Sequence, residues 1–202
     1  MAISARLAQL LTDQKISFTT HKHQTAYTAQ EIAAASHVPG RQLAKCVLVT
    51  TNRGPALAVL PAIVRVDTKK LKALLKAAKL SFASEADIKR LFPDVEVGAM
   101  PPFGHLYSVP TVVDRALAAC EEIVCNAGSH TETLELRYRD FERLEHPMVG
   151  DFGAPPPGQA PPRKKASKSS AKGSKKSKKA APKKKAVKKS TARGKSRRGR
   201  SR

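Results

Sequence analysis

The spacing of apolar residues divides the first 150 residues of the chain into short helices and strands. Apolar residues three or four positions apart predict a helix over residues 3–11, and alternation predicts a strand over residues 16–20. Two apolar runs, 46–51 and 56–60, are joined by Asn-Arg-Gly-Pro, which is typical of a β-hairpin. Further strands are expected over residues 95–97, 106–113, 123–126 and 133–137.

Short polar motifs mark where the helices begin. Thr28 and Glu31 have the spacing of a capping box, which predicts a helix over residues 29–36. Asp67 is placed to cap a helix over residues 68–77. Helices and strands interleave irregularly and include a hairpin, which favours an α+β domain with a mixed sheet over a doubly wound parallel one. The other expected helix starts are Ser84, before a short helix closed by Phe92, and Asp140.

Charge divides the chain into two parts. Residues 163–202 hold 20 of the 38 Lys and Arg and none of the 16 Asp and Glu. The residues before them are therefore close to neutral, and they are numerous enough to bury a core. Pro-rich residues 153–162 are typical of a stiff linker. Residues 163–202 have almost nothing apolar to bury, so we expect a disordered basic tail.

A tail this basic indicates nucleic-acid binding through the release of counterions from phosphates. It contains no aromatic side chain to stack on bases, so it is not expected to read sequence. An anionic membrane surface and a merely solubilising role are the alternative interpretations.

Several other classes of chemistry are disfavoured by what the sequence lacks. Three cysteines, an odd number, argue against a disulfide framework. No apolar run is long enough to span a membrane, and no apolar signal core begins the chain, which favours a cytoplasmic protein. No Cys/His set has zinc spacing and no glycine-rich nucleotide signature occurs, so we expect neither metal nor cofactor.

The loop Gly98-Ala-Met-Pro-Pro-Phe-Gly104 is the most constrained stretch in the sequence. Proline fixes φ and lacks an N–H, whereas glycine lets a ligand approach the backbone closely. We expect a stiff loop at the rim of the sheet that shapes a binding site. A plain turn between two strands is the alternative.

Several motifs occur together in an order that one known family shares. They are residues 23–33, Lys45 at the start of a strand, Gly98-x-x-x-Pro102, Asp114 and Asn126-Ala-Gly-Ser-His130. On these motifs the first 150 residues resemble the YbaK and prolyl-tRNA-synthetase-associated domains, which are free-standing aminoacyl-tRNA deacylases. The resemblance implies one compact α+β domain over residues 1–152, with a mixed, curved sheet flanked by helices.

The resemblance also implies a reaction. Such domains hydrolyse the ester that joins a wrong amino acid to the 3′ end of tRNA, typically alanine or cysteine on tRNA for proline. They use no metal, and the attacking water is helped by the 2′-hydroxyl of the tRNA itself. The expected partners are the 3′ aminoacyl end of tRNA and, through residues 163–202, nucleic acid of any sequence. No membrane partner is expected.

The resemblance assigns roles to named residues. Lys45 would offer a fixed cation to the carbonyl or phosphate end of the substrate; a solvated strand-end lysine is the alternative. The turn that ends at His130 could supply an oxyanion hole or hold the terminal adenosine, and His130 could orient the water. An ordinary Gly-Ser turn with a surface histidine is the alternative. The candidate catalytic residues are Lys45, Gly128, Ser129 and His130; the candidate substrate-binding residues are His23, Thr28, Gly98, Met100, Pro101, Pro102, Phe103, Gly104, Asn126 and Ala127.

Two further patterns have competing interpretations. Cys46 could be a nucleophile, but neighbouring strand residues face opposite sides of a sheet. If Lys45 faces the substrate, Cys46 is therefore expected to face the core. His21 and His23 share one strand face, which would suit a metal, although half-exposed strand residues are the simpler interpretation.

Two classes of function compete at this point. The first is an editing enzyme with a basic tail that raises its affinity for RNA. The second is a non-catalytic nucleic-acid-binding or nucleoid-associated protein, in which an editing fold carries a histone-like tail. The presence of Lys45, the Gly98–Pro102 loop and Gly128-Ser-His130 favours the enzyme.

Overall fold

A computed structural model describes residues 3–35 and 38–156 of the chain. In these residues an eight-stranded sheet has the order β1-β8-β7-β2-β3-β6-β9, with β5 paired to β2, and a second sheet joins β10 to β4. The strands are β1 (Phe18–Lys22), β2 (Leu43–Thr51), β3 (Gly54–Pro61), β4 (Arg65–Val66), β5 (Leu80–Phe82), β6 (Thr111–Asp114), β7 (Glu122–Asn126), β8 (Glu132–Arg137), β9 (Met148–Gly150) and β10 (Gly153–Ala154).

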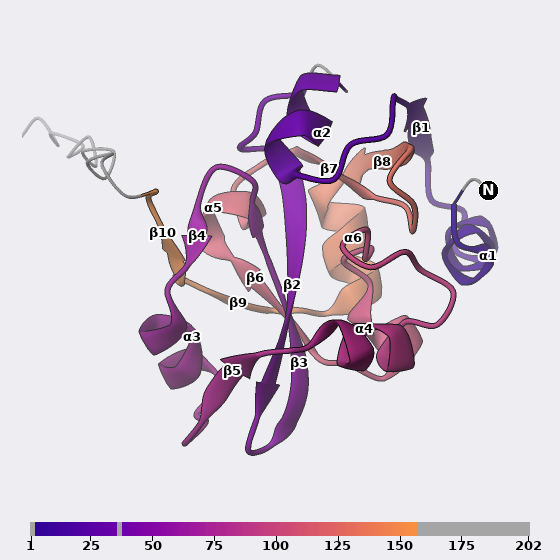
Figure 1. Cartoon of the computed structure of the whole chain (residues 1–202). Coiled ribbons are helices and arrows are strands. Elements are labelled where there is room, and N and C mark those ends of the chain that lie inside the picture. Colours follow the sequence, from indigo (N-terminus) through magenta and orange to yellow (C-terminus); the bar gives the residue numbers. More distant parts are fainter. Residues whose placement is uncertain (1–2, 36–37, 157–202) are drawn as a thin grey trace, which may run out of the picture. The chain divides into compact units, whose positions relative to one another are not determined.

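Helices flank this sheet on more than one side (Figure 1). Figure 1 places α3 beside β4 and β10 on the left, α2 at the top, and α1 and α4 on the right. The helices are α1 (Ala5–Asp13), α2 (Ala29–Ala35), α3 (Thr68–Leu74), α4 (Glu85–Leu91), α5 (Arg115–Ala118), α6 (Tyr138–Glu145) and the 3₁₀ turn η1 (Gly104–Tyr107).

The long β2–β3 hairpin organises the sheet, as its two apolar runs predict. Its strands pair antiparallel from Ala44 with Pro61 to Thr51 with Gly54. β2 then pairs in parallel with β7, and β3 in parallel with β6, so both pairing directions occur in one sheet. The expected α+β class with a mixed, curved sheet flanked by helices is confirmed.

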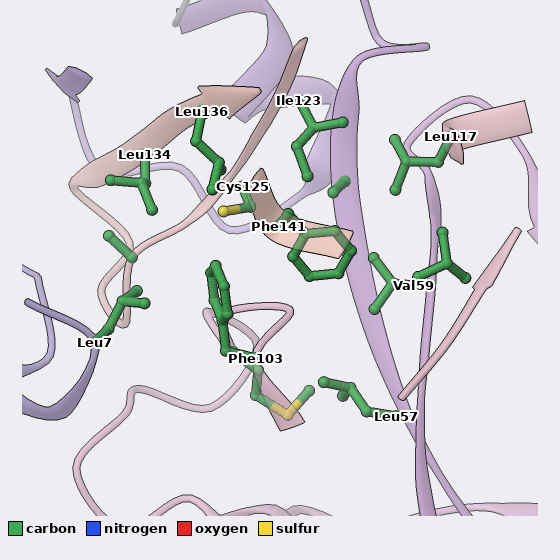
Figure 2. Packing of buried hydrophobic residues seen from close by; sticks show 14 of the residues in the cluster. Leu7, Leu57, Val59, Phe103, Leu117, Ile123, Cys125, Leu134, Leu136 and Phe141 are labelled. Atoms are coloured by element: carbon green, nitrogen blue, oxygen red, sulfur yellow. The ribbon is translucent and has the colours of Figure 1, made fainter. Parts of the chain in front are cut away.

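The largest buried cluster lies between the sheet and the helices α1, α4 and α6. Its side chains are seen in Figure 2, where Phe103 and Phe141 lie among leucines and Cys125. The rings of Phe103 and Phe141 meet edge to face, with centroids 5.4 Å apart. Smaller buried clusters lie beneath α3, around Leu71 and Phe152, and beneath α2, around Ile32 and Val124.

Three of the four expected helix starts form as predicted, whereas α6 begins at Tyr138, two residues before the expected Asp140, and has no side-chain cap. Thr28 Oγ1 accepts from the N–H of Glu31, and Glu31 accepts in return from the N–H of Thr28. These backbone donors lower the pKa of the Glu31 carboxyl. Asp67 caps α3, and Ser84 forms a complete capping box on α4. Such motifs are local, so they can be read without knowledge of the tertiary structure.

Two of the expected strands are wrong. Residues 95–97 are irregular, and the strand expected over 106–113 begins only at Thr111. The preceding residues form η1, which is closed by a hydrogen bond from the N–H of Val109 to the carbonyl of Gly104; a Cβ on Gly104 would lie 2.3 Å from the oxygen of Val109. The helix expected over 68–77 ends at Leu74, and Lys76 has a positive φ of 49°.

Asp114 ties the end of the folded part to the sheet. Its buried carboxylate accepts from the N–H groups of Ala116, Phe152 and Gly153. Gly153 and Ala154 then pair with β4, so strand structure includes the first two residues of the stretch expected to be a linker. The basic tail expected over residues 163–202 lies outside the described residues.

Candidate active site

A small recess of about 40 Å³ brings together residues from four parts of the chain. Lys45 comes from β2, Asn126 from the end of β7, Gly98 from the constrained loop, and Tyr27 from the segment before α2. Three of these four are residues that the sequence analysis proposes for the site. The recess lies on the α2 side of the sheet, where Leu43 and Val124 also face.

Lys45 is the third residue of β2, an inner strand of the sheet, and it lies on the same face as Leu43, which packs beneath α2. Its Nζ donates to the carbonyl oxygens of Ala62 and Val64. Burial and, to a smaller extent, the charge of Arg65 lower the pKa of the lysine. Two carbonyl contacts leave the third ammonium proton for a ligand, because an ammonium carries three donors.

Cys46 faces the opposite side, as the strand alternation predicts. It packs against the main hydrophobic core, next to Cys125. Burial, with smaller contributions from Cys125 and the charge of Glu145, raises the pKa of the Cys46 thiol well above its ordinary value. A thiol held in its neutral form is a poor nucleophile. The geometry therefore favours the interpretation of Cys46 as a core residue.

His130 is buried, and both of its ring nitrogens face backbone carbonyls. Nε2 lies 2.9 Å from the oxygen of Val97, and Nδ1 lies 3.2 Å from the oxygen of Ala26. The backbone carbonyl of His130 also accepts from the N–H of Ala26. A neutral imidazole has one N–H, so it donates to one of these carbonyls at a time. His130 thus joins the segment before α2 to the Gly98 loop.

Tyr27 is a site residue that the sequence analysis missed. Its ring packs on the ring of His130, with centroids 4.8 Å apart, yet 71% of the residue is exposed. An exposed aromatic at the rim of a recess offers a face on which a base can stack. The sequence feature that could have indicated Tyr27 was its position as an isolated aromatic residue in the mostly polar stretch between Gln24 and Thr28.

Gly98 also lines the recess. Its φ is +93°, a conformation that favours glycine, and a Cβ there would lie 3.4 Å from Cε1 of His130. Its carbonyl accepts from the side-chain amide of Asn126, at 3.4 Å. The loop is held in place by Asn126, a predicted substrate-binding residue, and by His130, a predicted catalytic residue.

Replacing Gly98 by alanine is expected to lower both stability and deacylation. The positive φ costs roughly 1–3 kcal/mol for a residue with a Cβ, and the methyl group enters the wall of the recess. Gly54 supplies the matched control, because its φ of +116° is equally unfavourable and a Cβ there meets nothing within 4 Å. Gly54→Ala should lower the melting temperature alone; an equal loss of activity in both variants would contradict a site role for Gly98.

Gly128 and Ser129 face a different hollow from Lys45. They line a cleft of about 510 Å³ together with residues 3–5 and 93–96. The N–H of His130, one of the donors expected for an oxyanion hole, is donated to the carboxylate of Glu96 at 2.8 Å. The structure therefore divides the proposed catalytic residues between two hollows: Lys45 lines the recess, whereas Gly128 and Ser129 line the cleft.

Most of the remaining candidates have structural contacts of their own. Thr28 caps α2, and the Nδ1 of His23 lies 2.7 Å from the carbonyl of Gln24. His21 pairs with Glu135 rather than with His23. The candidates buried away from the recess are Met100, Pro101, Pro102, Phe103, Gly104 and Ala127.

In residues 3–35 and 38–156, no three side chains among His, Cys, Asp and Glu gather in a way that could hold a metal ion. No helix in the same residues has the length and apolar character needed to cross a membrane.

Comparison with known proteins places this fold and site in context. Residues 23–144 match the family described as the aminoacyl-tRNA editing domain. The prolyl-tRNA editing protein ProX of Acetoanaerobium sticklandii is 27% identical over 149 residues, which cover 71% of this chain and 88% of that protein.

Solved structures share the fold at lower identity. A proposed trans-editing enzyme for prolyl-tRNA synthetase superposes with a TM-score of 0.67 at 20% identity, covering 75% of this chain and 96% of the other. A proposed signal transduction protein from Marinobacter aquaeolei gives a TM-score of 0.60 at 20% identity, covering 74% of this chain and 30% of the other. The family match spans more than half of the sequence and includes Lys45, Gly98 and His130. The chain therefore belongs to the aminoacyl-tRNA editing domain family and is an aminoacyl-tRNA deacylase.

Proposed function

We propose that this protein removes a small amino acid from mischarged tRNA in trans, with alanine or cysteine on tRNA for proline as the substrate. The observation that carries the proposal is the recess in which Lys45 and Gly98 meet. Its volume of about 40 Å³ suits a side chain no larger than a few heavy atoms. The ProX relative is named for prolyl-tRNA editing, which agrees with this choice of tRNA.

Lys45 is the proposed source of electrostatic stabilisation. Attack of water on the ester carbonyl places negative charge on the carbonyl oxygen, and a fixed ammonium group lowers the energy of that state. The carbonyls of Ala62 and Val64 hold the ammonium in position before substrate arrives. The water is activated by the 2′-hydroxyl of the terminal ribose, and no metal takes part.

The walls of the recess are the proposed basis of selectivity. Gly98 and Tyr27 both line the recess, and the His130 ring faces the carbonyls of the residues that precede them, Val97 and Ala26. One methylene is worth roughly 1–3 kcal/mol in a rigid pocket, so larger amino acids are rejected by size. His130 acts in this scheme by positioning the walls, because its ring nitrogens already face carbonyls.

Deacylation assays test this function directly. Wild-type protein should release alanine from alanyl-tRNA for proline faster than proline from the correctly charged tRNA, and EDTA should leave the rate unchanged. The same tRNA charged with cysteine and with serine ranks the amino acids. The competing nucleic-acid-binding role predicts tRNA binding without any release of amino acid. That outcome would refute the enzymatic proposal.

Truncation after Pro162 is expected to separate catalysis from general nucleic-acid affinity. Every residue of the recess precedes this point, so the truncated chain should still deacylate. If residues 163–202 engage about 8 phosphates, log affinity should fall with log salt at a slope of about −6, and truncation should make the slope much shallower. Binding of tRNA is measured from low to physiological salt with duplex DNA as competitor. If log affinity fell with log salt at the same slope for the full and the truncated chain, residues 163–202 would not be in contact with nucleic acid.

A further inference from the structure

Positive charge is concentrated on one side of the folded part, around α3. Residues 65–79 contain six Lys and Arg and one acidic residue, Asp67. The five lysines and Arg65 are all exposed. Elsewhere in the first 162 residues, 12 Lys and Arg stand against 15 Asp and Glu. The cationic surface is therefore local rather than a property of the whole domain. We call it the α3 basic face, made of Arg65, Lys69, Lys70, Lys72, Lys76 and Lys79.

The charges of this face are largely uncompensated. In the part of the chain that the structure describes, Lys70 alone among them has a carboxylate within 4.0 Å, that of Asp67 at 3.9 Å. The Asp67 carboxylate is also engaged as the cap of α3. Apolar contacts do not explain the lysines either, because the helix packs through Leu71, which is fully buried. Holding like charges together on one surface is unfavourable unless an anion binds there.

Both ends of this face are tied to other parts of the fold. Asn52 Oδ1 accepts from the N–H groups of Ala78 and Lys79, which fixes the segment after α3 to the β2–β3 turn, where Arg53 is exposed. At the other end, Arg65 follows Val64, whose carbonyl accepts from Lys45. The basic face thus runs from the hairpin turn to the backbone that holds the lysine of the recess.

The chain also leaves the folded part beside this face. β10 pairs with β4 in the register Gly153 with Val66 and Ala154 with Arg65. Figure 1 shows α3, β4 and β10 together at the left, away from α1 and α4. The last described strand before the Lys/Arg-rich residues 163–202 is therefore anchored next to Arg65.

We propose that the α3 basic face binds the phosphate backbone of the acceptor stem of tRNA while the 3′ end occupies the recess. A run of lysines recognises phosphates as point charges and needs no base contacts. The domain would then have its own duplex-binding surface, separate from residues 163–202. This inference rests on the proposed function, since it names the surface that holds the rest of the same substrate.

The test replaces Lys69, Lys72 and Lys76 by glutamine in the full chain. The matched control replaces Lys15, Lys22 and Lys89, three exposed lysines outside the face, which changes the net charge equally. Each variant is assayed with alanyl-tRNA for proline at physiological salt. Loss of three phosphate contacts should raise KM about tenfold or more and make the salt slope shallower by about 2–3, with kcat within twofold. The control should stay within twofold in KM.

A second substrate separates this inference from the proposed function. Alanyl-adenosine has the ester and the terminal ribose but no stem, so both triple variants should hydrolyse it at the wild-type rate. Equal increases of KM in the two variants would overturn the assignment of this face to the acceptor stem. So would a tenfold loss of binding affinity for duplex DNA with no loss of affinity for tRNA. Failure of the wild-type protein to hydrolyse any ester would instead refute the proposed function, and tRNA binding by the two variants would still decide the role of the face.

Discussion

Replacing Lys45 by methionine is expected to lower deacylation of mischarged tRNA about 30- to 1,000-fold. A charged hydrogen bond to the reacting group is worth roughly 2–4 kcal/mol, and each 1.4 kcal/mol is a factor of ten in rate. Methionine keeps the length and apolar stem of the side chain but cannot donate. The quantity measured is kcat/KM on alanyl-tRNA for proline. A rate within threefold of wild type would remove Lys45 from the site.

The neighbouring residue supplies the control for Lys45. Cys46→Ala changes the same strand on its other face, so it should affect packing and leave the chemistry intact. The loss of Lys45 also leaves the carbonyls of Ala62 and Val64 without a donor, which costs roughly 1–3 kcal/mol of stability. Melting temperatures of both variants show whether each remains folded at the assay temperature.

The lowered pKa of Lys45 adds a pH dependence. Because burial and Arg65 favour the neutral amine, the charge is lost at a lower pH than in an ordinary lysine. Enzymatic deacylation, corrected for spontaneous hydrolysis, should therefore decline on the alkaline side before free lysine loses its proton. For stability the sign is opposite: the unfolded state binds more protons between the two pKa values, so unfolding becomes less favourable as pH rises there.

Replacing His130 by alanine is expected to reduce kcat/KM about 100-fold and to lower the melting temperature. The substitution removes the ring that faces the carbonyls of Ala26 and Val97, and the carbonyl that loses its N–H donor costs roughly 1–3 kcal/mol. It also removes the surface on which Tyr27 packs. The segments that carry Tyr27 and Gly98 then lose their fixed position. A displacement of about 1 Å in the groups that position a substrate can lower the rate about 100-fold.

A second substitution distinguishes positioning from proton transfer at His130. Glutamine can donate to one of the two carbonyls but cannot act as an acid or base near neutral pH. If His130 positions the walls, His130→Gln should recover a substantial part of the activity lost in His130→Ala. It should also retain the wild-type order of preference among alanine, cysteine and serine. Equal inactivity of the two variants, with folding intact, would indicate a chemical role instead.

The sequence by itself determined those features that depend on a few neighbouring residues. The capping box at Thr28, the helix start at Ser84 and the hairpin that turns before Gly54 need only local contacts, and each forms as predicted. The opposite orientation of Lys45 and Cys46 follows from the two-residue period of a strand. The sequence also allowed the chain to be assigned to an editing family, because the motifs of that family occur in it in the same order.

Only the tertiary structure decided which of these residues meet. Asn126, Gly98 and Lys45 are far apart in the sequence. The parallel pairing of β7 with β2 brings Asn126 beside Lys45, and the Asn126 amide in turn donates to the carbonyl of Gly98. His130 follows a turn at Gly128, but whether its ring faces substrate or backbone depends on where the segments carrying Ala26 and Val97 pack. Hydrogen-bond partners brought from distant segments leave no periodic signal in the chain, so the role of His130 required the fold.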